Sequence, residues 1–174
     1  RQTAEAICDA GALAGEKAKS IIDERLRERE FGVFDGLTTL GIRERFPEEA
    51  AHRAKMGKFY HRPPGGESWP DVILRLRSAL NTINLLYADR RVAIVCHQVV
   101  VLCFRYILEE LEEAQILAID KEAHILNCGI CAFDFEAGST GICVPRLDIW
   151  NQGAPLDFED TPKTSEPDVM AGTR

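Results

Sequence analysis

The pattern of apolar and polar positions predicts helices that alternate with short apolar strands. Apolar residues repeat at helical spacing from Trp69 to about Tyr87, which predicts a helix with one buried face. Residues 92–96 are a continuous apolar run, and we interpret 91–96 as a buried strand; a second helical pattern follows over 98–110. A strand that leads into a helix is the repeating unit of α/β folds, so this segment indicates the fold class.

The N-terminal third has weaker patterns. Residues 1–19 are alanine-rich and helical in character, and residues 20–26 resemble a short strand. Thr38 or Thr39 is placed to cap a short helix that ends at Phe46, just before a proline. We therefore expect a helix, a strand and a second helix before the main apolar segments.

The remaining segments are assigned from polarity and alternation. Residues 47–64 are polar and predict irregular structure. Residues 109–118 are expected to be helical or turn-like, and two strands are expected at 128–135 and 142–149. Together with the earlier elements they describe one α/β domain.

Composition indicates a single globular domain. Of the 174 residues, 45% are hydrophobic and 28% are charged. We expect an α/β domain over 1–150 and an acidic, proline-containing tail over 151–174 with little apolar surface to bury. The net charge of −7, without a dense basic run, argues against a nucleic-acid partner, and no apolar run is long enough for a membrane span. The cysteines lie mostly in apolar surroundings, which favours a cytoplasmic location.

A C-x-x-C motif raises the question of a metal site. Cys128 and Cys131 form it, and His124 precedes it. One pair of thiols is too few ligands for zinc, and in a strand two positions that are three apart point to opposite faces. We therefore expect no metal centre.

The first candidate for chemistry is His97. It follows the apolar run directly and precedes a helical pattern, so we expect it at the carboxyl end of a strand. Ligands of open α/β sheets bind at that edge, and the N–H groups at a helix start favour a phosphate. Taken alone, such a histidine is either structural or catalytic.

Two polar segments add further candidates. Glu28 lies between arginines in a glycine-containing loop; it belongs either to a solvated charge run or to a site where it acts as a general acid, with Arg29 available to phosphate. Lys58 and Arg62 precede a Pro-Pro-Gly-Gly turn. They form either an ordinary polar loop or a basic lid over the far end of an anionic substrate.

Four motifs occur in a fixed order: Arg1 to Ala6; Glu28-Arg29 with Phe31-Gly32; Gly65-Gly66-Glu67-Ser68; and Val95-Cys96-His97-Gln98. Their order and spacing over residues 1–135 resemble the histidine phosphatase superfamily, which includes phosphoglycerate mutases and the bisphosphatase domain of fructose-2,6-bisphosphatase. The resemblance implies a phosphoglycerate mutase-like fold, a three-layer sandwich with a mostly parallel sheet flanked by helices.

The same resemblance implies a phosphohistidine mechanism. In this family a histidine of an Arg-His-Gly motif takes up the phosphoryl group, and water or a second substrate then removes it. His97 matches the second histidine, which binds the transferring oxygens, and Glu28 matches the acid that later acts as a base. The other residues expected to bind substrate or phosphate are Arg29, Gln98, Lys58 and Arg62.

The sequence departs from the family in one respect, since it contains no Arg-His-Gly. We expect the nucleophile, its arginines and the first strand of the sheet to lie before Arg1. The printed chain alone is then expected to be inactive, and its apolar strand edge to be unpaired.

Several functions stay open. The segment between Gly32 and Gly65 is short, which favours a phosphatase of small sugar or glycerate phosphates. The alternatives are a phosphoglycerate mutase and a non-catalytic relative that binds a phosphorylated ligand or a protein. No cofactor is expected, except a 2,3-bisphosphoglycerate primer for a mutase. The expected partner is a small phosphorylated metabolite, and both a monomer and a homodimer are compatible with the sequence.

Overall fold

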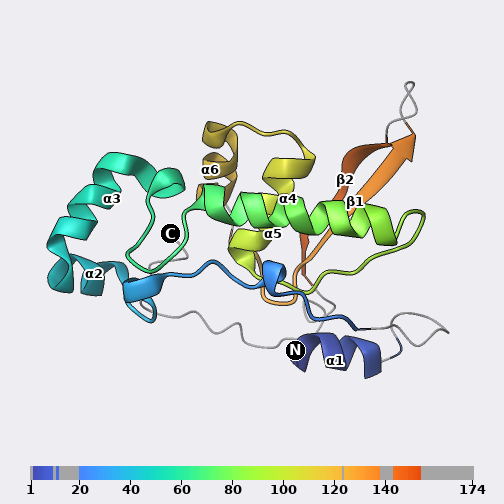
Figure 1. The fold of residues 1–174 in the computed structure, drawn as a ribbon, viewed down its shortest axis with the longest axis horizontal. Helices are drawn as coiled ribbons and strands as arrows, with labels where there is room; N and C mark the ends of the chain where they lie inside the picture. The colour runs from blue at the N-terminus through green and yellow to red at the C-terminus, as the bar shows by residue number, and fades with distance from the viewer. Residues whose placement is uncertain (1, 10, 12–19, 123, 138–142, 154–174) are drawn as a thin grey trace.

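The computed structural model describes residues 2–9, 11, 20–122, 124–137 and 143–153. In chain order the elements are α1 (Gln2–Asp9), the 3₁₀ helices η1 (Glu24–Leu26) and η2 (Gly32–Phe34), α2 (Thr39–Arg45), α3 (Pro47–Tyr60), α4 (Trp69–Leu86), α5 (Gln98–Leu108), α6 (Glu113–Glu122), β1 (Ile130–Ala137) and β2 (Cys143–Gln152) (Figure 1). The described part is helix-rich, and its sheet has two antiparallel strands, β1 and β2.

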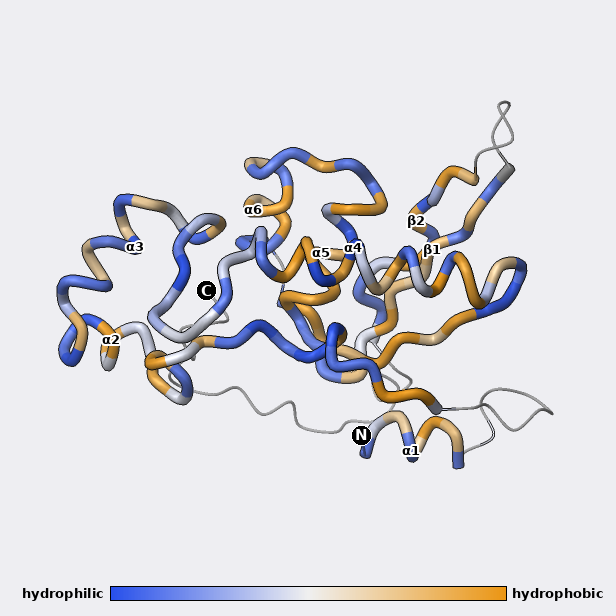
Figure 2. Tube along the Cα trace, in the orientation of Figure 1, coloured by the Kyte–Doolittle hydropathy of each residue, from blue (hydrophilic) through white to orange (hydrophobic). Residues whose placement is uncertain are grey.

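The main core lies between α4 and α5. Helix α4 crosses the middle of the molecule, and the strongly hydrophobic α5 packs against it (Figures 1 and 2). The largest fully buried apolar side chains are Trp69, Val72 and Leu76 of α4, Val100, Leu102 and Cys103 of α5, and Ile116 of α6. A smaller cluster around Phe34 and Ile42 supports α2 and the start of α3. Burial of these side chains removes apolar surface from water and holds the helices together.

The helices predicted from apolar spacing are confirmed. Helix α4 begins after Ser68, which forms a capping box with Asp71: the Asp71 N–H donates to the Ser68 hydroxyl and the Ser68 N–H donates to the Asp71 carboxylate. Helix α5 ends two residues earlier than expected. Thr38 caps α2, because its hydroxyl accepts a hydrogen bond from the Gly41 N–H.

The prediction of irregular structure over 47–64 is wrong, since α3 occupies most of that segment. Pro47 stands at the first turn of the helix, where its missing N–H is harmless, and two glutamates follow it. The helix lacks a clear apolar stripe, so apolar spacing does not reveal it. Gly57, with φ 80°, interrupts the helical backbone near the end of α3.

Two predicted strands are also absent from the described residues. Residues 20–26 contain η1, and residues 91–96 form no strand hydrogen bonds there. Val92 and Val95 are 44% and 42% exposed, so the expected burial of that run is wrong in this structure. A strand requires a neighbour to complete its hydrogen bonds, and the described residues supply none to this segment.

The remaining segments follow the predictions more closely. The strands expected at 128–135 and 142–149 are β1 and β2, and the segment expected to be helical or turn-like at 109–118 is the region of α6. Helix α1 confirms the helical start of the chain, whereas 12–19 and 154–174 lie outside the described residues. None of the described helices has the length and apolar content required to cross a bilayer.

Candidate active site

The carboxylate of Glu28 lies at the N-terminus of α5. Its Oε2 accepts a hydrogen bond from the backbone N–H of Val99 at 3.3 Å, across 71 positions of sequence, and its Oε1 accepts one from the Arg29 N–H at 2.7 Å. His97 is the residue that precedes α5, and its side chain forms no capping bond to the helix. The structure therefore brings the two predicted catalytic residues to one helix end, where free N–H groups and the helix dipole attract anions.

His97 and Gln98 have side chains suited to a ligand. The side chain of His97 is exposed. The side-chain Nε2 of Gln98 is buried and has no hydrogen-bond partner within the described part of the chain. A buried donor without an acceptor is unfavourable, and Gln98 is the first residue of α5, so its amide is a candidate donor to a ligand at this helix end.

Cys96 directly precedes His97, and its thiol is poorly suited to act as a nucleophile. Burial, together with the negative charge of Glu28, raises the pKa of the Cys96 thiol to about 12. The thiol therefore stays protonated at neutral pH. All six cysteines are free, although Cys128 and Cys143 are exposed rather than in the apolar surroundings expected for most of them.

Two glycine motifs form the loop that carries Glu28. The backbone N–H of Glu67 donates to the Glu30 carbonyl at 2.9 Å. Gly32 has φ +55°, and a Cβ there would lie 2.1 Å from the Pro64 carbonyl oxygen; a Cβ on Gly66 would lie 2.7 Å from the Glu30 carbonyl oxygen. Glycine is required at both positions, because the two backbones approach more closely than a side chain permits.

Glu67 anchors this loop to α4. Its carboxylate accepts hydrogen bonds from Arg75 Nε at 2.9 Å and from the Glu30 N–H at 3.1 Å, and Arg75 Nη2 also donates to the Glu28 carbonyl at 3.3 Å. Burial alone would raise the pKa of Glu67, but the hydrogen bonds from Arg75 and Glu30 lower it below the ordinary value. An ionised Glu67 therefore holds the backbone from Glu28 to Glu30 against α4, both directly and through Arg75.

Arg29 lies inside the protein rather than in open solvent. It is 6% exposed, and its side chain donates to two backbone carbonyls, from Nε to Glu67 at 2.6 Å and from Nη2 to His61 at 3.2 Å. Burial and the nearby charge of Arg53 lower its pKa to about 10, so it is still a cation at neutral pH. In this structure Arg29 links the Glu28 loop to the end of α3, and its contact with phosphate stays a prediction.

Lys58 belongs to a cavity beside α2 and α3. The cavity has a volume of about 320 Å³, and the basic side chains that line it are Arg43, Arg53 and Lys58. Lys58 donates to the Asp120 carboxylate at 2.5 Å, and burial lowers the pKa of the lysine. Sequence reasoning missed both arginines. It assigned no helix to the segment that contains Arg53, and so it could not bring that residue next to Arg43 of the expected helix before Phe46.

Arg62 lies on the surface, where both Nε and Nη2 donate to the Asp71 carboxylate. Its side chain is 62% exposed, so it is accessible to a ligand. Neither His97 nor Glu28 lines the cavity that contains Lys58. The structure thus unites Glu28, His97 and Gln98 at one helix end and places Lys58 and Arg62 on different elements.

Comparison with curated proteins finds relatives that share part of the chain. The human 6-phosphofructo-2-kinase/fructose-2,6-bisphosphatase 3 is 36% identical over 89 residues, which are 51% of this chain and 16% of that protein. The enzyme of the same name from Caenorhabditis elegans is 31% identical over 123 residues, covering 65% of this chain and 26% of the relative. This chain therefore spans about a sixth to a quarter of the length of these relatives.

Comparison with solved structures identifies the fold. A mycobacterial glucosyl-3-phosphoglycerate phosphatase in complex with inorganic phosphate matches with a TM-score of 0.66 at 26% identity, over 87% of this chain and 72% of that one. A structure described as mycobacterial hydrolase 2 matches with a TM-score of 0.67 at 25% identity, over 88% and 68%. These neighbours confirm the α/β phosphoglycerate mutase-like class, although the described residues hold an antiparallel pair in place of a mostly parallel sheet.

A family model extends the match along most of the sequence. It covers residues 1–145, and this range contains Glu28, the Gly65-Gly66-Glu67-Ser68 turn and His97. The chain belongs to the histidine phosphatase superfamily, branch 1.

Proposed function

We propose that this protein hydrolyses phosphomonoesters of small sugars or glycerate through a phosphohistidine intermediate. The observation that carries the proposal is the hydrogen bond from the Val99 N–H to Glu28, because it fixes a carboxylate beside a phosphate-binding helix end. His97 and the first N–H groups of α5 would bind the transferring phosphoryl oxygens, and the amide of Gln98 would donate to them.

Glu28 would act first as an acid. A histidine nitrogen attacks phosphorus, the bond from phosphorus to the ester oxygen breaks, and the leaving oxygen takes the proton of the Glu28 carboxylic acid. Glu28 then removes a proton from water, whose oxygen attacks phosphorus, breaks the P–N bond and releases inorganic phosphate. These steps use two protonation states of one carboxylate, as general acid–base catalysis requires.

The contacts of Glu28 hold it where a bound phosphate would lie. Its carboxylate accepts backbone N–H bonds from Arg29 and Val99, so both of its oxygens are fixed at the start of α5. A phosphate at the same helix end would lie beside this carboxylate, within reach of the leaving oxygen.

The phosphoryl-accepting histidine is the group that the sequence does not identify. None of the four histidines stands in an Arg-His-Gly motif. We propose that this histidine lies outside the printed sequence, in the full-length protein. The described residues would then supply the acid and the second histidine of the site.

The basic cavity supports a substrate with a second anionic group. Arg29 and Arg53 lie close enough to Lys58 for their charges to add to the effect of burial in lowering its pKa. Like charges held together in this way are stabilised by an anion. A sugar bisphosphate or a glycerate carboxylate would provide one.

The test is a product analysis on the full-length protein. Candidate substrates are glucosyl-3-phosphoglycerate, fructose 2,6-bisphosphate and 3-phosphoglycerate, each with and without 2,3-bisphosphoglycerate. Release of inorganic phosphate that does not depend on the primer, and that His97→Ala slows by about 100-fold or more, supports the proposal. Primer-dependent formation of an isomer would instead identify a mutase, and binding without turnover would identify a non-catalytic relative.

A further inference from the structure

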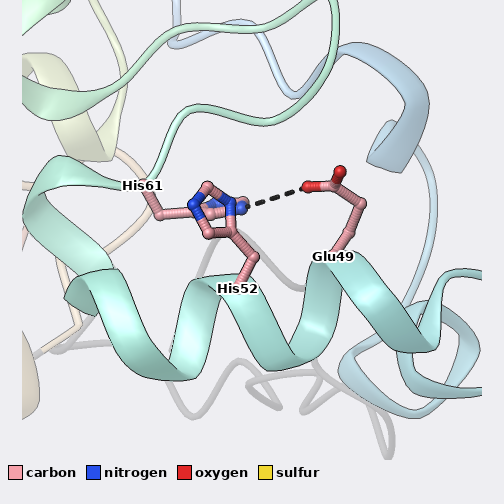
Figure 3. A group of neighbouring side chains, drawn as sticks. All are labelled: Glu49, His52 and His61. Atoms are coloured by element: carbon pink, nitrogen blue, oxygen red, sulfur yellow. Dashed lines mark ion pairs between the residues drawn. The ribbon is translucent and has the colours of Figure 1, made fainter.

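Three potential metal ligands converge on α3, outside the residues assigned to catalysis. They are Glu49 and His52 within the helix and His61 at its C-terminal end, and Figure 3 shows their side chains directed toward one another. One ligand atom from each lies within 4.8 Å of the others. No other group of three such side chains converges among the residues that the structure describes.

The backbone explains why these residues meet. Glu49 and His52 are three positions apart, so they lie on one face of the helix. Gly57 leaves the helical conformation, and the chain then places His61 beside that face. The His61 ring stacks on Phe34, with centroids 6.0 Å apart, and meets the His52 ring edge-on at 5.5 Å.

His61 has an unsatisfied polar atom. Its side chain is 1% exposed, and its Nε2 has no hydrogen-bond partner within the described part of the chain. The Glu49 carboxylate is 3.6 Å from this nitrogen, an ion-pair distance marked by the dashed line in Figure 3 that is too long for a hydrogen bond.

We propose that Glu49, His52 and His61 bind one divalent transition-metal ion, with Zn²⁺ the best match. Two imidazoles and one carboxylate are a common zinc ligand set, whereas Ca²⁺ and Mg²⁺ prefer oxygen ligands throughout. Zinc–ligand bonds of about 2.1 Å place tetrahedral ligand atoms roughly 3.4 Å apart. The ligand atoms lie within 4.8 Å of one another, so side-chain movements of up to about 1.4 Å would bring them to this distance. His52 is exposed, which leaves the fourth position open to water.

The ion would act on the structure around Glu28 rather than on the substrate. The backbone carbonyl of His61 accepts a hydrogen bond from Arg29 Nη2 at 3.2 Å, and the Arg29 N–H donates to Glu28 at 2.7 Å. A metal ion that holds the His61 ring against α3 therefore also fixes one anchor of the Glu28 loop. Metal binding and folding are coupled in such sites, so the ion is expected to raise thermal stability.

The experiment has to separate this site from thiol ligands. Cys128 and Cys131 are free, and a pair of thiols also binds zinc. We would treat the full chain with a chelator, remove the chelator, and titrate it with ZnCl₂ by calorimetry and with CoCl₂ by absorption spectroscopy. A thiolate ligand gives cobalt an intense charge-transfer band that imidazole and carboxylate ligands do not give.

The expected result is one ion per chain without a thiolate band. His52→Ala and Glu49→Gln should each weaken the affinity for Zn²⁺ by at least about tenfold. Loss of a residue that only supports a metal ligand already has an effect of this size, and loss of a ligand itself should be at least as large. Both side chains reach solvent, and each touches only the edge of the buried His61 ring, so both variants are expected to fold. His124→Ala, an exposed histidine elsewhere, and Cys128→Ser should bind as the wild type does.

The thermal readout uses the same variants. Zn²⁺ should raise the melting temperature of the wild type and of His124→Ala, but not that of His52→Ala. Absence of binding, unchanged binding in His52→Ala, or loss of binding in Cys128→Ser would each overturn the proposal. None of these measurements depends on phosphatase activity, so the result is separate from that of the proposed function.

Discussion

Glu28 and Val99 are joined by a hydrogen bond of 3.3 Å that connects a loop carboxylate to the first turn of α5. The contact makes Glu28 part of the helix end that His97 precedes. It also leads to a first prediction. A glutamine at position 28 keeps an oxygen that can accept the hydrogen bond from Val99, but it has no carboxylic acid proton to donate.

Glu28→Gln in the full-length protein should lower kcat for an alkyl phosphate by about 100- to 10,000-fold, because the leaving oxygen then receives no proton. The loss should be much smaller for p-nitrophenyl phosphate, whose leaving group is stable as an anion. Steady-state kinetics on both substrates measure the difference. Glu30→Gln, an exposed carboxylate in the same loop, serves as the control, and equal losses on both substrates would contradict an acid role.

His97→Ala should reduce kcat by about 100- to 1,000-fold, the effect of removing one donor to a developing oxyanion. Its melting temperature should stay close to that of the wild type, because the side chain is exposed. His124→Ala, which replaces another exposed histidine, should keep full activity. A His97→Ala protein that turns over at the wild-type rate would show that the phosphate binds elsewhere.

Gly32→Ala should destabilise the fold more than Gly36→Ala. Both glycines have a positive φ, which costs an alanine about 1–2 kcal/mol, but only Gly32 faces a backbone atom at 2.1 Å, whereas Gly36 has open space around it. The total for Gly32→Ala should exceed about 3 kcal/mol. The difference in unfolding free energy between the two variants, measured with urea, gives the cost of the steric clash at Gly32. Equal losses would mean that the loops at Gly32 and Gly66 are not in close contact.

Lys58→Gln combined with Arg62→Ala should raise KM for a sugar bisphosphate by about 10-fold or more, since each charge-assisted bond contributes about 1.5–3 kcal/mol. Glutamine keeps an N–H donor for Asp120, so the effect of lost charge is separated from that of an unpaired buried carboxylate. KM for p-nitrophenyl phosphate should not change, because it has no distal anion. Arg45→Gln, exposed on α2, is the control, and equal increases on both substrates would exclude a distal contact.

Stability should fall in acid partly through Glu67. Its pKa is lower in the folded protein than in the unfolded chain, so the unfolded state binds more protons as the solution becomes acidic. This contribution is complete above the pKa of a free glutamate and is lost as pH falls through the lower, folded value. The Glu67→Gln variant should be less stable than the wild type near neutral pH, and its unfolding free energy should fall less as the pH is lowered. Urea unfolding at several pH values measures both, and parallel pH dependences for the two proteins would refute the role of Glu67.

Local signals in the sequence were sufficient for α4 and α5. Apolar residues repeat along one face of each helix, and Ser68 marks the start of α4 with its own hydrogen bond. The position of His97 at a helix start follows from the change of pattern at that residue. Helical spacing and helix capping both involve residues that are only a few positions apart, so the sequence alone is sufficient to reveal them.

Long-range features were harder to predict. Helix α3 lacks an apolar stripe, and Pro47 was interpreted as the end of one helix although it begins the next. The cluster of Glu49, His52 and His61 was therefore invisible, because it requires that helix. The composition of residues 91–96 does not show which strand they would pair with. The contact of Glu28 with α5 has no local signal in the sequence, because Glu28 and Val99 are 71 positions apart; the family resemblance assigns roles to Glu28 and His97 without giving this contact.

The interlocked glycine loops have a consequence for the order of folding. The Glu30 carbonyl receives its hydrogen bond from Glu67, and Glu28 receives one from Val99, 71 positions away. Contacts between distant parts of a chain form late, because their loops must close first. Activity should therefore return only in the final phase of refolding, after the helical signal has recovered, which makes turnover a direct measure of the fully native state.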